Sequence, residues 1–213
     1  MSTAVEKTET RSAEPASRFA ILKAASEEFA LKGYAGARTE RIATTAGVKH
    51  TLLFYYFKTK EQLYRAVIET VFSEWNSRVS RALNSEGSAQ QRMLVYVNSY
   101  FDFIEEFPLS PKLVQQEHMR QNSELSEQLS SLVERYVRPV HRKLVTLLRE
   151  GISNGSFYDV DIEHCLHSIS ALIIFYFTGN LAVESVERVQ VHPRLIALRR
   201  KAVLDFISRA IFR

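Results

Sequence analysis

Residues 39–63 read TERIATTAGVKHTLLFYYFKTKEQL, a run that predicts two short helices and the start of a third. Thr39 is placed to cap a short helix, and Gly47 breaks that helix after about two turns. A further short helix follows directly over Lys49–Phe57. Thr59 is then a predicted N-cap for a long helix. Two short helices joined by a tight turn have the form of a helix-turn-helix.

A helix is also expected upstream, over Ala16–Lys32, because apolar residues recur there at helical spacing on one face. These residues are Phe19, Leu22, Ala25 and Phe29. Gly33 is placed to end this helix as its C′ residue. Residues 1–15 mix Thr, Ser, Glu, Lys and Arg without an apolar core, so we expect a disordered tail and not a secretory signal.

The rest of the chain keeps helical spacing and indicates an all-α fold. We expect a helix from Thr59 to about Leu83, one that ends before Pro108, and further helices over Lys112–Arg120, Glu124–Arg138, Pro139–Gly151, Ile162–Phe177 and Pro193–Phe212, with a loop over Asn180–His192. Pro139 either kinks a continuous helix or opens a new one. The predicted domains are a three-helix helix-turn-helix domain over residues 16–62 and a C-terminal helical bundle over residues 63–213.

Composition narrows the class of protein. Seven Gly and five Pro in 213 residues are few, which favours helices over a turn-rich β fold. Cys165 is the only cysteine, so an intramolecular disulfide is excluded and a cytoplasmic location is expected. The most apolar stretch, Ile169–Phe177, is far shorter than the roughly 20 residues that span a bilayer, so we expect a soluble protein with no membrane partner.

The positive charge is confined to one end of the chain. Residues 1–60 contain ten Lys/Arg against six Asp/Glu, whereas residues 61–213 contain eighteen of each. The net charge of +4 therefore belongs to the first 60 residues. An anionic partner for that part alone, such as nucleic acid, is the simplest interpretation.

Residues 16–68 resemble the TetR family of transcriptional regulators. In that pattern a Thr opens the second helix, Ala-Gly-Val forms the turn, an aromatic run ends the third helix and Thr-Lys-Glu-x-Leu starts the fourth. Phe54 stands where the family often has Tyr, and Tyr56 stands where it often has His. The resemblance implies a DNA-binding regulator whose C-terminal helical domain binds an effector and dimerises.

The resemblance also implies roles for individual residues in binding double-stranded DNA. Base edges would be reached from the start of the third helix by Lys49, His50 and Thr51. Phosphates would be held by Thr39, Tyr56 and Lys60. Tyr55 would pack on thymine methyl groups or on the backbone. The alternatives are that the tyrosines belong to the core, that the lysines are only solvated, and that Thr39 is only a helix cap.

The C-terminal part offers candidates for effector binding and for a homodimer. Aromatic residues with a few polar ones among them are typical of an apolar pocket: Tyr100, Phe103, Phe107, Gln116, Tyr136, His141 and Phe175. A bundle core with surface amides would look similar. The last two long helices are the predicted dimer interface, through Leu166, Ile169, Ile173, Leu195, Leu198 and Leu204. By resemblance, the recognition helices would lie about one DNA turn, roughly 35 Å, apart on a pseudo-palindromic operator.

Nothing in the sequence makes a case for catalysis. There is no Gly-rich phosphate loop, no G-x-S-x-G elbow and no Cys-x-x-Cys pair, so we expect neither an enzyme nor a bound cofactor. His164 and His167 have a usable metal-ligand spacing but no partner elsewhere, so no metal site is predicted. The predicted function is a repressor that a small-molecule effector releases from its operator by shifting the helix beginning near Lys60. The alternatives are a helical small-molecule sensor or carrier without DNA binding, and an activator on the same fold.

Overall fold

The computed structural model describes residues 3–119, 130–178 and 193–213, and these residues are almost entirely helical. They contain no β-sheet, and a lone antiparallel bridge joins Phe157 to Phe212. The chain divides into two compact units, Met1–Thr70 and Val71–Arg213. The predicted all-α class is confirmed. Throughout the described ranges, no helix combines the length and the apolarity that a membrane span requires.

The first unit consists of α1 (Thr3–Gly36), α2 (Thr39–Thr45), α3 (His50–Phe57) and the beginning of α4 (Lys60–Leu83). Gly33, expected to end the first helix, has a φ of 67° and a ψ of 171°, a non-helical conformation that favours glycine and interrupts α1 before its last turn to Gly36. The helix begins at Thr3 instead of Ala16, so it includes most of the segment expected to be disordered. Residues 3–14 contain no Gly and several good helix formers, which makes a helical extension possible.

The core of the first unit comes from all four helices. Its largest buried side chains include Phe29, Ile42, Leu53 and Tyr64, and the Phe29 and Tyr64 rings meet edge to face at 4.9 Å. Phe19 was expected on this face but is 66% exposed. It lies six residues before the fully buried Ala25, about 120° around an ideal helix, and therefore points away from the core.

The second unit contains the remainder of α4 and six further described elements. These are α5 (Ala89–Glu106), α6 (Ser110–Met119), the π-helical turn η1 (Val133–Val137), α8 (Arg138–Ser153), α9 (Ile162–Thr178) and α11 (Pro193–Ile211). The expected helices that begin near Thr59, end before Pro108, and cover Lys112–Arg120, Pro139–Gly151, Ile162–Phe177 and Pro193–Phe212 are present with shifts of a few residues at their ends. The expected helix over Glu124–Arg138 lies partly outside the described residues, and the expected loop over Asn180–His192 lies wholly outside them.

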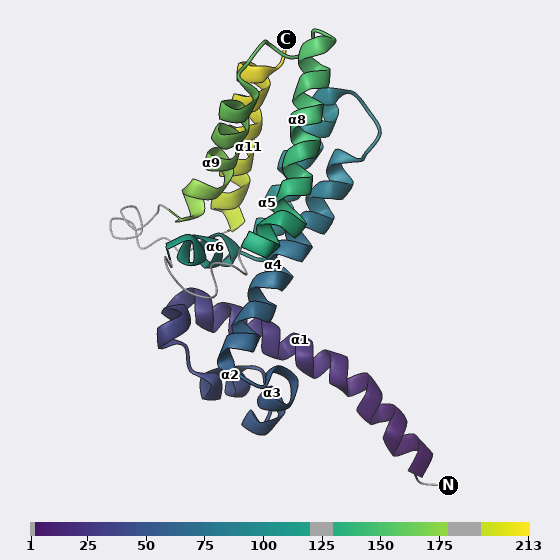
Figure 1. Ribbon diagram of the computed structural model, residues 1–213, viewed down its shortest axis with the longest axis vertical. Helices are drawn as coiled ribbons and strands as arrows, with labels where there is room; N and C mark the ends of the chain where they lie inside the picture. The colour runs from purple at the N-terminus through teal and green to yellow at the C-terminus, as the bar shows by residue number, and fades with distance from the viewer. Residues whose placement is uncertain (1–2, 120–129, 179–192) are drawn as a thin grey trace. The chain divides into compact units, whose positions relative to one another are not determined.

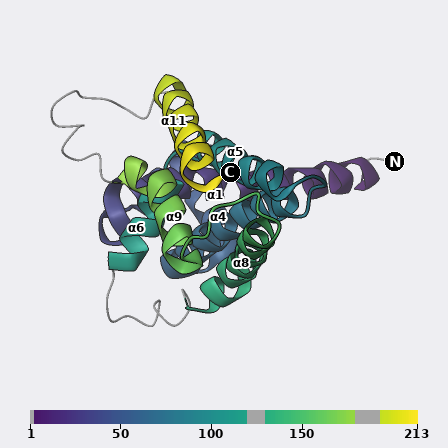
Figure 2. The same ribbon diagram turned by 90° about the horizontal axis from the view of Figure 1, so that it is seen from above.

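Four helices of the second unit pack in a closed order. α5 contacts α8, α8 contacts α9, α9 contacts α11, and α11 contacts α5 (Figure 1). Figure 2 shows α5, α8, α9 and α11 from above. Their inward residues are fully or almost fully buried and include Phe101, Ile104, Leu148, Ile173 and Ile207.

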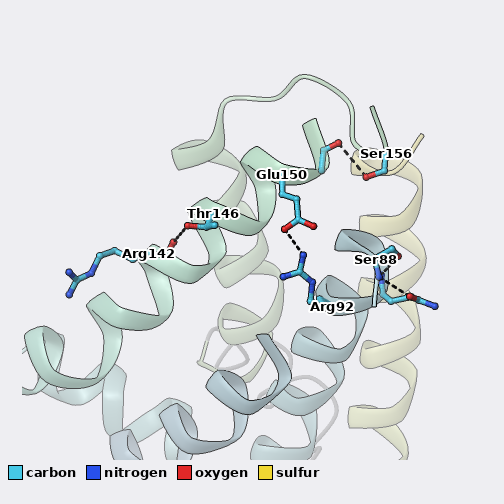
Figure 3. A network of polar contacts seen from close by, with 8 residues as sticks. Ser88, Arg92, Arg142, Thr146, Glu150 and Ser156 are labelled. Carbon is cyan, nitrogen blue, oxygen red and sulfur yellow. Dashed lines mark hydrogen bonds and ion pairs between the residues drawn. The ribbon is translucent and has the colours of Figure 1, made fainter. Parts of the chain in front are cut away.

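One end of this bundle is fixed by polar contacts and by a tight aromatic fit. Arg92 of α5 pairs with Glu150 of α8, close to the Ser88 cap of α5 (Figure 3). The Phe157 ring stacks on Phe212 at 5.2 Å and lies directly over Gly151, where an added Cβ would clash with the ring. Glycine is therefore required at position 151 for close approach.

Pro139 lies at the start of α8, where the helical backbone continues without a break from the π-turn η1. It lies in the first turn of α8, where its missing N–H is tolerated. The chain enters α8 directly from the π-turn η1. Val137 and Arg138 both have helical backbone angles, so the chain changes from π- to α-helical hydrogen bonding here without leaving the helix.

Candidate functional site

The turn between α2 and α3 has the geometry of a helix-turn-helix. The Ala46 N–H donates to the Ile42 carbonyl at 2.9 Å, and the Val48 N–H donates to the Ala43 carbonyl at 3.0 Å. Gly47 lies between them with a φ of 67°. A Cβ on Gly47 would meet nothing within 4 Å, so the glycine is required by its backbone conformation and not by lack of space.

α3 is anchored by one face and exposes another. Leu53 and Phe57 are buried against the rest of the first unit. Lys49, which precedes the helix as its N-cap residue, and Thr51 are exposed, and Tyr55 is 60% exposed. A cation, a hydroxyl and an aromatic ring thus project from one short, rigidly held helix.

His50 and Thr39 contact each other instead of projecting freely. The His50 Nε2 lies 3.0 Å from the Thr39 Oγ1 and 3.8 Å from the Glu40 Oε1, and the His50 ring meets Phe54 edge to face. Thr39 is buried and is the first residue of α2, whose N-cap is Arg38. Its predicted role as N-cap is therefore wrong, because its hydroxyl pairs with His50 and no side-chain cap bond forms.

The remaining predicted DNA contacts lie around the end of α3. Tyr56 is half-buried, with its ring 5.4 Å from that of Tyr55. The Lys60 Nζ turns back onto the end of α1, 5.0 Å from the centre of the Tyr34 ring and 3.4 Å from the Ala35 carbonyl oxygen. Sequence reasoning did not select Lys58, whose Nζ lies 5.2 Å from the centre of the Tyr55 ring. Its position three residues after Tyr55 was the available signal.

Thr59 caps α4 as predicted. Its Oγ1 accepts a hydrogen bond from the Gln62 N–H at 3.1 Å. Lys58, immediately before it, has a φ of 52°, an uncommon value for a residue with a side chain. This sharp connection sets the direction in which the chain leaves α3.

The second unit contains a partly open cavity of about 350 Å³. Its lining comes from α4, α5, α6, η1, α8 and α9. Tyr100, Phe103 and His141 line it, as the sequence predicted. Trp75 and Tyr96 also line it but were not selected. Tyr96 precedes Tyr100 by one helical turn, so spacing alone indicated it.

Four of the predicted effector residues do not line this cavity: Phe107, Gln116, Tyr136 and Phe175. Phe107 follows the end of α5 with a φ of −122°, so it leaves the face that carries Tyr100 and Phe103. Phe175 is 69% exposed because it lies about 100° around α9 from the cavity-lining Ile174. The prediction chose these residues because the helices are rich in aromatic and polar side chains, without regard to which face of each helix they occupy.

The electrostatic character of the cavity is close to neutral. Burial raises the pKa of the Tyr96 and Tyr100 hydroxyls well above their ordinary value, and Tyr96 adds to the effect on Tyr100. Both side chains therefore stay uncharged at physiological pH. Two histidines also line the cavity: the His141 Nε2 lies 3.0 Å from the Glu163 Oε2, and the His167 Nδ1 donates to the Glu163 carbonyl at 2.7 Å.

The predicted dimer residues divide into two groups. Leu166, Ile169 and Ile173 of α9 are buried inside the second unit, so their side chains have no surface left for a partner. On α11, by contrast, Leu198 is 58% exposed and Leu195 and Leu204 are half-buried. The sequence pattern identified the apolar face of α9 correctly but not what covers it. No group of three potential metal ligands occurs within the described parts of the chain.

Both units match models of known protein families. Residues 21–67 match the family described as bacterial regulatory proteins, tetR family. Residues 90–207, more than half of the chain, match the tetracyclin repressor-like C-terminal domain. The second match covers most of the unit that contains the cavity.

Individual relatives agree with these matches. The transcriptional repressor NicS of Pseudomonas putida is 27% identical over 170 residues, which cover 78% of this chain and 77% of NicS. The transcriptional regulator RutR of Escherichia coli K12 is 28% identical over 184 residues, covering 86% and 84%. The crystal structure of FadR from Bacillus subtilis in complex with stearoyl-CoA superposes with a TM-score of 0.66 at 22% identity, covering 89% and 96%. The helix-turn-helix geometry and the two family matches together establish that this chain belongs to the TetR family of DNA-binding transcriptional regulators.

Proposed function

We propose that this protein is a homodimeric repressor that binds a pseudo-palindromic operator through α3 and is released by a small-molecule effector in the cavity of the second unit. The observation that carries the proposal is the exposed face of α3, with Lys49, Thr51 and Tyr55 projecting from a helix held by buried Leu53 and Phe57. A helix presented in this way fits the major groove. The repressor NicS among the relatives supports the sign of regulation.

The exposed residues divide the work of recognition. Lys49 and Thr51 reach base edges, and Tyr55 packs on thymine methyl groups or sugar. Thr39 and His50 act as a pair that positions the starts of α2 and α3, because the Thr39 Oγ1 and the His50 Nε2 contact each other at 3.0 Å. Tyr56 and Lys60 remain proposed phosphate contacts, and Lys60 reaches DNA by leaving its place over Tyr34.

DNA binding is tested by fluorescence anisotropy with the promoter of the protein's own gene or of a neighbouring gene. We expect binding that weakens steeply with salt, and Lys49→Ala and Thr51→Ala to weaken it about tenfold or more. Lys112→Ala changes an exposed lysine in the second unit and is the matched control. Unchanged affinity in both α3 variants, with the fold intact by circular dichroism, would contradict the proposed face.

Homodimerisation is proposed through the outer sides of α9 and α11. Phe175, Leu198 and Phe206 are each more than half exposed, although such large apolar side chains favour burial. Two copies packing these helices together would cover the three residues. Leu195 and Leu204 flank them on α11 and complete the proposed interface.

Effector release is proposed to act through α4, which begins in the first unit and continues to the cavity at Val71, Phe72 and Trp75. A ligand that binds better to one position of α4 shifts the population of dimers toward that position. The crystal structure of FadR in complex with stearoyl-CoA supports a small-molecule effector on this fold. A promoter–reporter strain with and without the gene decides between repression and activation.

A further inference from the structure

The side chains around the cavity differ from one group of helices to the next. Trp75 of α4 and Tyr96, Tyr100 and Phe103 of α5 form an aromatic series around Tyr100. The centre of the Tyr100 ring lies 5.7 Å from that of Trp75, 6.2 Å from that of Tyr96 and 6.4 Å from that of Phe103. The contributions of η1, α8 and α9 are mainly aliphatic and include Val137, Val140, Leu144, Leu166 and Ile174. This lining suits a largely apolar ligand.

The lining offers no strong counter-charge. None of the lining residues that the structure describes is Lys, Arg, Asp or Glu. A buried carboxylate or phosphate loses its hydration, and this lining replaces only part of it, because His141 and His167 are already engaged with Glu163 and no lysine or arginine is present among the described lining residues. The same desolvation raises the pKa of the neighbouring Tyr96 and Tyr100 hydroxyls. An uncharged ligand is therefore favoured over an anionic one.

Two hydrogen-bond donors of cavity-lining residues are buried without a partner in the part of the chain that is described. They are the Trp75 Nε1 and the hydroxyl of Ser110, the first residue of α6, which is only 3% exposed. The indole N–H can only donate, so its partner must be an acceptor. A buried donor left unpaired is unfavourable, and a ligand that supplies an acceptor removes that penalty.

We propose that the effector is an uncharged, largely apolar small molecule that carries a carbonyl acceptor, as in a ketone, ester or lactone, and that Trp75 and Ser110 donate to that acceptor. The aromatic series would cover the apolar body of the molecule. This inference rests on the proposed role of the cavity as the effector site and specifies the chemistry of its ligand.

The test uses three probes of nearly equal shape: the ketone benzylacetone, the carboxylate hydrocinnamate and the hydrocarbon isopentylbenzene. Trp75 is the only tryptophan in the chain, so its fluorescence reports on the cavity directly. We expect benzylacetone to bind about tenfold or more tightly than hydrocinnamate, and more tightly than isopentylbenzene. Equal or tighter binding of hydrocinnamate, or no fluorescence change with any probe, would overturn the proposal.

Single substitutions test the two donors. Ser110→Ala should weaken benzylacetone about tenfold and leave isopentylbenzene unchanged. Trp75→Phe, followed by calorimetry, should have the same selective effect. Ser168→Ala is the matched control, because the Ser168 hydroxyl is exposed on α9 and donates to the His164 carbonyl at 2.8 Å. Equal weakening of both probes by Ser110→Ala and Trp75→Phe would contradict the assignment of the donors.

These measurements are made on the full chain without DNA. A failure of operator binding would therefore refute the proposed repressor function and leave the ranking of probes unaffected. A reversed ranking would refute the ligand class and leave the operator measurements standing.

Discussion

At the scale of single residues, Gly151 is the described glycine at which an added Cβ would meet the nearest neighbouring atom. An added Cβ would clash with the Phe157 ring, which is itself buried and stacked on Phe212. We expect Gly151→Ala to lower the free energy of unfolding by about 1–3 kcal/mol, because overpacking forces the ring to move. Thermal and urea denaturation measure this.

The control for this substitution is Gly36→Ala. A Cβ there would meet only Lys32 Cβ at an ordinary 3.5 Å, and Gly36 has no positive φ, so stability should change little. Equal effects of both substitutions would contradict the tight fit at Gly151.

The Thr39–His50 contact makes a second prediction at this scale. Thr39→Val and His50→Ala should each weaken operator binding, because each removes one side of a 3.0 Å contact between α2 and α3. Because both disrupt the same contact, we expect the double variant to lose about as much as one single variant, with a coupling of roughly 0.5–3 kcal/mol. Additive losses in anisotropy titrations would instead indicate that Thr39 contacts phosphate independently of His50.

At the scale of elements, the start of α5 depends on a capping box. The Ser88 Oγ accepts from the Gln91 N–H at 3.2 Å, and the Gln91 Oε1 accepts from the Ser88 N–H at 2.9 Å. Ser88→Ala should lower the free energy of unfolding by about 0.5–2 kcal/mol, whereas Ser88→Thr, which keeps a capping hydroxyl, should retain most of it. Chemical denaturation of both variants distinguishes the cap from a general effect of position 88.

Helix boundaries marked by a glycine or by the Thr59 cap were predicted from sequence because these signals are local, whereas the start of α1 and the N-cap of α2 were not. The Thr59 cap and the glycines at positions 33 and 47 all occur where expected. Which side of a helix faces a cavity is not local. Ile173 and Phe175 both follow the apolar pattern of α9, yet one is fully buried and the other is 69% exposed. The two residues lie about 200° apart on the helix, and the packing of α9 against α6, α8 and α11 determines which of these sides is buried.

At the scale of the whole molecule, the proposed dimer predicts that one charge on α11 will abolish assembly. Leu198→Glu should convert the protein to a monomer in analytical ultracentrifugation and weaken operator binding about tenfold or more, because one monomer engages only half a site. Val95→Glu, at a 42% exposed apolar residue of α5, is the matched control and should stay dimeric. Two variants that sediment alike would contradict this interface.

The two units were not equally predictable. The helix-turn-helix depends on a short, contiguous run with a turn glycine and two anchoring apolar residues, so residues 39–63 were enough to identify it. The cavity is formed by side chains as far apart in sequence as Trp75 and Ile174. Trp75 lies on the regular apolar pattern of α4, and nothing local distinguishes it from a core residue. Its role depends on helices that meet only after folding.

Opposite sides of α9 contribute to the cavity and to the proposed dimer interface, which affects how effector affinity is measured. Leu166, Ser170 and Ile174 line the cavity, while Phe175 projects from the outer side proposed to meet a second copy. A single rigid helix thus links occupancy of the interior to self-association, and such linkage is reciprocal. The apparent affinity for an effector should therefore vary with protein concentration across the dimer–monomer transition, so dose–response curves taken at different expression levels should not superimpose.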